Sequence, residues 1–268
     1  MTALVLGQLV GTGMRSHVFA LDDHRVVKVP RDGTPDTWMR REAEYTAAVH
    51  ALGLPVPAML ELAVHEGRTV VVYQRVLGPS MWAAVIDRPA NASLLGQTLA
   101  ELHLALLHKA APVSLPRQRD RLACKIRTVR EIVGPEIEAQ FERRADSRAP
   151  MRLCHGDLHP GNVIMSPDGP IVLDWFDASR GEVLADVARS SILMGAGTRM
   201  NAPLLHLVPI DRGSLRLLHD AYLDTMKSRV PSFDDLAFAE WLRIGAAARV
   251  AEGVGGSELL SLARPPEG

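Results

Sequence analysis

The feature that most constrains this chain is a loop-like stretch, His-Gly-Asp-Leu-His-Pro-Gly-Asn, at residues 155–162. Asp174 follows Asn162 by twelve residues, across a Pro-Asp-Gly sequence that predicts a tight hairpin. Asp157 and Asn162 stand five residues apart on one predicted loop, so both side chains can face the same site. Phosphoryl transfer needs a carboxylate to orient an attacking hydroxyl and oxygen ligands for Mg²⁺. Asp157, Asn162 and Asp174 are candidates to supply these groups.

A second candidate element lies between two β-rich segments near the N-terminus. Gly11 and Gly13 would let backbone N–H groups approach phosphate oxygens, and Ser16 would add a hydroxyl donor. The same Gly-Thr-Gly sequence is also typical of an ordinary hairpin turn, so both interpretations stay open.

Lys28 stands among valines in a predicted strand at residues 26–29. Because strand side chains alternate, Lys28 faces away from the valines beside it. A helix predicted from about Asp36 to Leu52, with Gly53 as its terminator, offers Glu42 and Glu44 as ionic partners. The alternative is a solvent-facing lysine on a half-buried strand.

Together, the 155–162 stretch and the following Leu-Asp-Trp resemble the aminoglycoside phosphotransferase and choline kinase-like family. The resemblance implies that Asp157 is the catalytic aspartate and that Asn162 and Asp174 are the Mg²⁺ ligands. It favours Glu42 over Glu44 as the partner of Lys28 in contacting the α- and β-phosphates. It also implies that Asp186 caps a helix and braces the catalytic loop.

The same resemblance identifies residues 73–78 as the hinge that reads the purine base. The Arg75 carbonyl and the Val76 amide would face the base, and Tyr73 would stand at the back of its pocket. A phenol there narrows the pocket, so either ATP or GTP is expected as phosphate donor.

The predicted fold class is α+β, with a bilobal protein-kinase-like architecture. Residues 1–77 would form a small β-rich N-lobe that binds nucleotide, with one helix. Residues 78–268 would form a larger, mostly helical C-lobe that carries the catalytic loop, the metal site and the acceptor-binding helices.

Composition excludes some classes of partner. The net charge of -1 and the pI of about 6.8 give no electrostatic reason to expect nucleic acid or an anionic membrane. Two cysteines make no disulfide framework, and no signal peptide is recognised at the N-terminus. A cytoplasmic protein is expected.

These observations predict a small-molecule kinase that transfers the γ-phosphate of ATP or GTP to a hydroxyl of a small acceptor. Two alternatives remain: a catalytically silent nucleotide-binding module, or a metal-dependent hydrolase using His155, Asp157 and His159. The acceptor is expected to contact roughly residues 187–260. From residue 197 to residue 268, nine acidic residues stand against eight basic ones, and Asp234, Asp235 and Glu240 are the best acidic candidates for a polycationic antibiotic.

Overall fold

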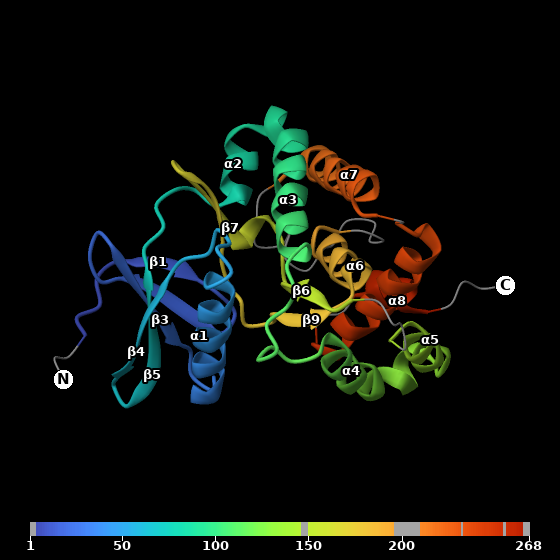
Figure 1. Ribbon diagram of the computed structural model, residues 1–268, viewed down its shortest axis with the longest axis horizontal. Helices are drawn as coiled ribbons and strands as arrows, with labels where there is room; N and C mark the ends of the chain where they lie inside the picture. The colour runs from blue at the N-terminus through green and yellow to red at the C-terminus, as the bar shows by residue number, and fades with distance from the viewer. Residues whose placement is uncertain (1–3, 146–149, 196–209, 232, 254–255, 265–268) are drawn as a thin grey trace. The chain divides into compact units, whose positions relative to one another are not determined.

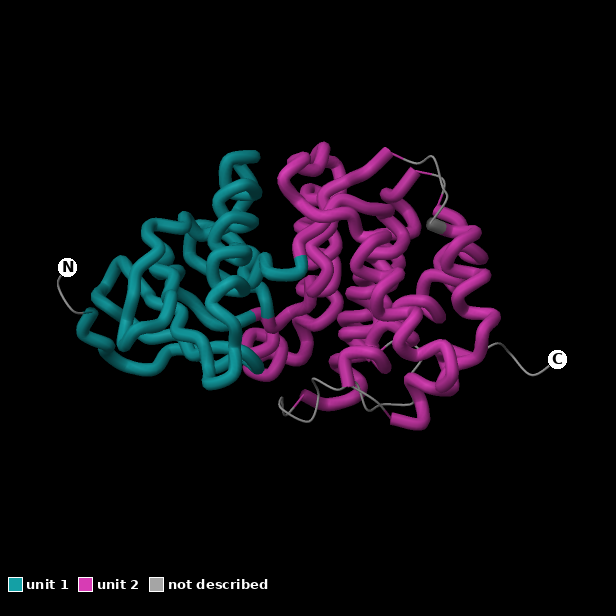
Figure 2. Tube along the Cα trace, turned by 90° about the horizontal axis from the view of Figure 1, so that it is seen from below, with its two compact units in different colours: residues 1–80, 162–177 teal, residues 81–161, 178–268 magenta. Residues whose placement is uncertain are grey.

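The structure is a computed structural model that describes residues 4–145, 150–195, 210–231, 233–253 and 256–264 (Figure 1). The chain divides into two compact units, which Figure 2 colours separately. Unit 1 comprises residues 1–80 and 162–177, and unit 2 comprises residues 81–161 and 178–268.

Unit 1 is built on a five-stranded antiparallel sheet with the strand order β1-β2-β3-β5-β4 (Figure 1). Its strands are β1 (Leu9–Thr12), β2 (Ser16–Ala20), β3 (Arg25–Pro30), β4 (Met59–His65) and β5 (Arg68–Gln74). Helix α1 (Asp36–His50) connects β3 to β4 and packs on β5. It ends at His50, two residues before the predicted Leu52, and Gly53 follows with a φ of 71°, the left-handed conformation expected of a helix terminator.

The apolar run of β5 supplies both faces of this sheet. Val70 and Val72 join one buried cluster with Val27 of β3. Val71 and Tyr73 point the other way, into a cluster with Met39 and Ala43 of α1. Because successive strand side chains alternate between faces, a strand covered on both sides must be apolar throughout.

Unit 1 also contains the hairpin of β7 (Val163–Ser166) and β8 (Gly169–Val172). The sequence-based division assigned this hairpin to the C-lobe and placed the boundary at residue 77; here the boundary falls after Ser80. Backbone hydrogen bonds explain the difference. Met165 N donates to Pro79 O at 2.9 Å, and Val172 N donates to Pro55 O at 2.8 Å.

Unit 2 is mainly helical. Its helices are α2 (Met81–Asp87), α3 (Ala92–Leu107), α4 (Gln118–Val133), α5 (Glu136–Ala145), α6 (Val183–Leu193), α7 (Arg212–Arg229), α8 (Asp235–Ala251) and α9 (Ser257–Ala263). Helix α3 packs along α7, and α6 packs along α8. Two short antiparallel strands, β6 (Arg152–Cys154) and β9 (Ser179–Gly181), flank the 155–162 stretch and the β7–β8 hairpin in sequence.

The predicted α+β class is confirmed, with strands dominating unit 1 and helices dominating unit 2. Across the described residues, no helix combines the length and the apolar character that crossing a bilayer requires.

Candidate active site

Lys28 is the centre of an ionic cluster in unit 1. Its Nζ lies 2.5 Å from Glu42 Oε1 and 3.3 Å from Asp174 Oδ1. Glu42 of α1 is buried, whereas Glu44 of the same helix is exposed, so the geometry selects Glu42 as the partner. The Tyr73 hydroxyl donates to the same Glu42 oxygen at 3.5 Å. Lys28 is therefore no solvent-facing lysine, and its side chain is 13% exposed.

Charge and burial act on this cluster in opposite directions. Burial alone would lower the pKa of Lys28, but the carboxylates of Asp174 and Glu42 outweigh burial and raise that pKa. Burial raises the pKa of Tyr73, which keeps the phenol a neutral donor to Glu42. Lys28 is thus a fixed cation held beside two carboxylates.

Asp174 and Asn162, the two predicted metal ligands, are joined through their backbones. Asp174 has a φ of 59°, a conformation uncommon outside glycine that tends to occur at functional sites. The preceding residue, Leu173, donates its N–H to Asn162 O at 2.8 Å. The Asp174 side chain is 43% exposed. A half-exposed carboxylate and an amide oxygen are both ligand types that Mg²⁺ prefers.

The glycine loop forms a tight turn between β1 and β2. Gly11 lies opposite Val18, and Gly13 N donates to Ser16 O at 2.8 Å. Gly13 is exposed, and Ser16 is buried at the start of β2. The hairpin-turn interpretation therefore describes the local geometry, and the Gly13 amide already has a partner within the turn.

Arg15 ties this loop to two other segments of unit 1. Its guanidinium lies 4.8 Å from the Trp38 ring of α1 and 4.9 Å from the Phe176 ring. The two rings are themselves 5.1 Å apart. Each cation–π contact contributes about 0.5–1 kcal/mol at exposed sites. The sequence interpretation missed this cluster, which links the loop to the segment just after Asp174.

The predicted hinge follows β5. Arg75 N donates to His24 O at 2.8 Å, and the Arg75 guanidinium donates to Asp22 O at 2.9 Å. Across the described residues, no backbone group hydrogen-bonds to the Arg75 carbonyl or to the Val76 amide. These two groups are the ones assigned to the purine base.

In unit 2, Asp157 lies on the loop that follows β6, with a side chain that is 26% exposed. Two histidine rings hold this loop. His155 Nδ1 accepts from Asp157 N at 3.2 Å, and His159 Nδ1 accepts from Gly161 N at 3.0 Å. Within the described ranges, no group of three or more His, Cys, Asp or Glu residues could hold a metal ion. The rings act as loop acceptors, which is not what the hydrolase alternative expects.

Asp186 braces the same loop from the first turn of α6. Its carboxylate accepts from His155 N at 2.7 Å and from Gly156 N at 2.8 Å. It does not cap the helix as predicted, because Glu182 occupies the N-cap position. Burial opposes its charge, yet the hydrogen bond to His103 and the charges nearby keep the pKa of Asp186 below its usual value.

Two buried partners of this brace escaped the sequence interpretation. His103 of α3 lies with Nε2 3.0 Å from Asp186 Oδ2 and with Nδ1 2.7 Å from the Tyr222 hydroxyl of α7. His103 and Tyr222 each lie in a helical pattern, where such a residue indicates only a position in the hydrophobic core and predicts no partner. Arg189 and Glu252, which also contact the loop or its neighbours, were missed for the same reason.

The acidic candidates for a polycationic acceptor all have structural roles. Asp234 caps α8 by accepting from Leu236 N and Ala237 N. Asp235 lies 2.6 Å from Lys227, and Glu240 pairs with Arg144. Residues 196–209 of the expected acceptor region lie outside the described residues.

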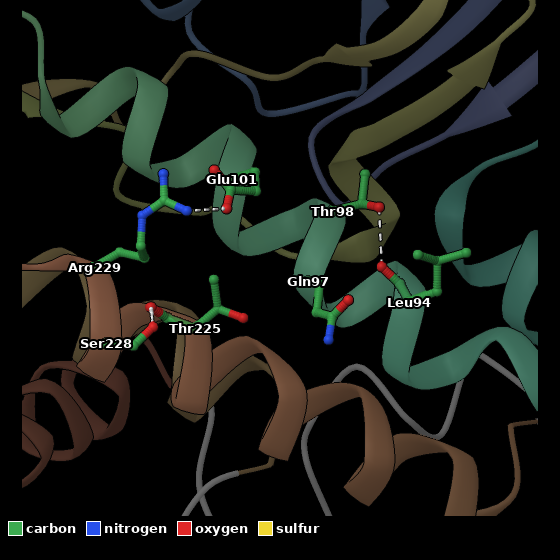
Figure 3. Close-up of a pocket in the computed structure, with 7 residues that line it drawn as sticks. All are labelled: Leu94, Gln97, Thr98, Glu101, Thr225, Ser228 and Arg229. Atoms are coloured by element: carbon green, nitrogen blue, oxygen red, sulfur yellow. Dashed lines mark hydrogen bonds and ion pairs between the residues drawn. The ribbon is translucent and has the colours of Figure 1, made fainter.

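A surface pocket of about 520 Å³ lies between α3 and α7 (Figure 3). An ion pair of 3.1 Å between Arg229 and Glu101 is part of its wall. It is lined by Leu94, Gln97, Thr98, Glu101, Thr225, Ser228 and Arg229. None of the predicted site residues lines it, so it is separate from the groups described above.

Solved structures define the class of this fold. Aminoglycoside-3'-phosphotransferase of type VIII aligns at TM-score 0.61 and 18% identity, covering 91% of this chain and 92% of that one. The GDP complex of aminoglycoside 2'-phosphotransferase-IIIa aligns at 0.59 and 16%, covering 98% and 92%. APH(3'')-Id from Streptomyces rimosus aligns at 0.57 and 19%, covering 87% and 89%. The predicted protein-kinase-like fold is confirmed.

The particular family follows from the sequence itself. Residues 7–218, most of the chain, match the phosphotransferase enzyme family APH, and the chain belongs to that family. A curated relative from Deinococcus radiodurans, described only as an uncharacterized protein, is 28% identical over 215 residues. That match covers 70% of this chain and spans 58% of the relative's length.

Proposed function

We propose that the protein is a small-molecule kinase that transfers the γ-phosphoryl group of ATP or GTP to a hydroxyl of a small acceptor. The observation that carries this proposal is the placement of Lys28 between Glu42 and Asp174. In kinases, a strand lysine held by a helix glutamate contacts the nucleotide phosphates. Membership of a phosphotransferase family supports the same conclusion.

In the proposed reaction, Asp157 accepts a hydrogen bond from the acceptor hydroxyl and orients its oxygen toward the γ-phosphorus. As that oxygen forms its bond to phosphorus, the hydroxyl proton passes to Asp157. The bond to the β–γ bridging oxygen breaks, and the nucleoside diphosphate leaves. Lys28 holds the α- and β-phosphates, and the loop at Gly11, Gly13 and Ser16 covers them.

Asn162 and Asp174 would hold Mg²⁺, which neutralises charge on the phosphate oxygens when bound. Asp174 also pairs with Lys28 at 3.3 Å. Lys28 has a second carboxylate partner in Glu42, so a metal-binding role of Asp174 is compatible with the ionic cluster.

For the nucleotide, we assign the Arg75 carbonyl and the Val76 amide to the base. Relatives of the same fold include a GDP complex of aminoglycoside 2'-phosphotransferase-IIIa and an ATP complex of APH(2")-IIa with streptomycin. Both ATP and GTP are therefore candidate donors.

For the acceptor, the engaged state of Asp234, Asp235 and Glu240 removes the best sequence argument for a polycationic aminoglycoside. A neutral or mildly charged hydroxyl compound, such as a sugar or an amino alcohol, is as good a candidate acceptor as an aminoglycoside.

The test is nucleotide consumption by the purified protein with Mg²⁺ and ATP or GTP, against aminoglycosides, macrolides, sugars, choline-like amino alcohols and homoserine. Acceptor-dependent turnover that Asp157→Ala lacks would support the kinase. Nucleotide binding without turnover across the panel would favour the silent-module alternative. Equal turnover by wild type and Asp157→Ala would remove Asp157 from the mechanism.

A further inference from the structure

A second ionic cluster, in unit 2, converges on Glu252, the residue directly after α8. Lys125 Nζ lies 2.6 Å from Glu252 Oε1. Arg189 Nη2 and Arg249 Nη1 lie 3.2 Å and 2.5 Å from Glu252 Oε2. The Glu252 side chain is 17% exposed. One carboxylate thus joins cations from α4, α6 and α8.

The local structure at the end of α8 does not explain why a carboxylate occupies position 252. Gly253 follows with a φ of 73°, and the amides of Glu252 and Gly253 satisfy carbonyls of the last turn of α8. A negative charge at this end of a helix is disfavoured by the helix dipole. Burial would also raise the pKa of Glu252, but Arg189, Lys125 and Arg249 outweigh burial and lower it to about 2. The charge is therefore stabilised by tertiary contacts.

Arg189 extends this cluster to the loop that bears Asp157. Its Nε donates to Gly156 O at 3.1 Å, and its Nη2 lies 3.5 Å from Asp157 Oδ1. The side chain is 14% exposed. Arg189 therefore contacts both the backbone just before Asp157 and the carboxylate of Asp157, and Glu252 contacts the same Nη2 that faces Asp157.

The geometry of arginine makes this arrangement directional. A guanidinium is planar and presents its donors in a rigid fork. With Nε fixed on Gly156 O and Nη2 fixed by Glu252, the contact to Asp157 has one orientation. Removing Glu252 would take away one of the contacts that orient the guanidinium and would leave the Asp157 carboxylate less restrained.

We propose that Arg189 and Glu252 are positioning residues for phosphoryl transfer: Glu252 fixes the Arg189 guanidinium, and Arg189 fixes the Asp157 carboxylate in the direction of the acceptor hydroxyl. This inference rests on the proposed role of Asp157. Both residues act through Asp157 and need not touch a substrate. A displacement of about 1 Å at a reacting group costs on the order of 100-fold in rate, so such a support is kinetically significant.

The kinetic test uses Arg189→Gln, Glu252→Gln and the double variant, assayed with an acceptor that wild type turns over. Each single variant should lose about 10- to 100-fold in kcat, with KM for nucleotide and acceptor within about twofold of wild type. The double variant should be no slower than Arg189→Gln, because Glu252 acts through Arg189. Arg189→Lys, which keeps the charge without the fork, should recover only part of the loss.

Glu240→Gln is the matched control, because Glu240 lies on α8, the helix that Glu252 follows, and pairs with an arginine, Arg144, instead of Arg189. It should leave kcat unchanged. A higher acceptor KM at unchanged kcat in Arg189→Gln would overturn the proposal, since Arg189 would then bind the acceptor directly. Multiplicative losses in the double variant would overturn it as well.

A second measurement needs no turnover and so separates this inference from the proposed function. The backbone amide resonances of Gly156 and Asp157 should shift in Glu252→Gln and stay in place in Glu240→Gln. If they stay in place in both, the link from Glu252 to the loop is wrong, whatever the protein catalyses. If they shift while Asp157→Ala retains full turnover, the link holds but the proposed role of Asp157 falls, and the positioning role falls with it.

Discussion

Unit 1 holds its central lysine by one local and one distant contact, whereas the brace of the Asp157 loop in unit 2 rests on distant contacts. In unit 1, Lys28 of β3 pairs with Glu42, fourteen residues later on the next helix of the chain, and with Asp174, 146 residues away. In unit 2, the brace of the Asp157 loop joins Asp186 to His103, 83 residues away, and the second cluster joins Arg189 to Glu252, 63 residues away.

The difference shows where sequence patterns lose their predictive value. A strand followed directly by a helix restricts which glutamate can meet Lys28, so the local sequence narrows the candidate partners to Glu42 and Glu44. The partners of Asp186 and Arg189 depend on how α3, α6 and α8 pack, and helical periodicity does not reveal that packing. Four substitutions would break or sharpen this comparison.

The largest effect is expected for Asp157→Ala. Loss of the proposed general base should lower kcat by about 10²- to 10⁴-fold. Nucleotide binding, assigned to unit 1, should change little. Steady-state kinetics would measure the loss of kcat, and calorimetric titration of ATP or GTP would measure nucleotide affinity. A matching loss of nucleotide affinity would contradict the assignment of catalysis to Asp157 and of nucleotide binding to unit 1.

Next comes the Glu42 pair in unit 1. Glu42→Gln leaves Lys28 with Asp174 as its remaining charged partner in the cluster, which should disturb the phosphate contact and lower kcat/KM by about 100-fold. Glu44→Gln, two residues away on an exposed face, is the control and should keep wild-type kinetics. Similar losses in both variants would show that pairing with Lys28 is not what makes Glu42 important for activity.

Glu252 should make the stability of the protein dependent on acid pH. Its pKa is lowered from 4.5 to about 2 in the folded state, so the stabilisation is fully present above about pH 4.5 and is lost as the pH falls toward 2. The difference is about 3 kcal/mol. Urea unfolding of wild type and Glu252→Gln should give a gap that narrows as pH falls through this range. A gap independent of pH would contradict the ionic role of Glu252.

A smaller effect is expected for Asp186→Asn. The amide keeps one acceptor oxygen for the N–H groups of His155 and Gly156, but loses the charge that those donors and His103 share. A lost hydrogen bond to a buried charged group costs roughly 2 kcal/mol. Chemical denaturation would measure it. Asp235→Asn, at an exposed ion pair with Lys227, should cost less than about 1 kcal/mol.

Much of the fold was predictable, because Val26-Val27-Lys28-Val29 and residues 69–73 have strand patterns and Gly53 ends its helix as expected. Strand β4 was missed, since it lies at the sheet edge and most of its side chains are exposed. Strands β6 and β9 were missed because each has three residues and forms only through pairing with the other.

The sequence by itself determined the family, the α+β class and the candidate residues Asp157, Asn162 and Asp174, because these lie in one short ordered motif. Tertiary structure alone decided that Lys28 also faces Asp174, that Asp186 is itself held by His103, and that Glu252 reaches Arg189. The physical reason is that a motif specifies the residues of one segment. A buried charge, in contrast, finds its partner only after distant helices have packed and excluded water.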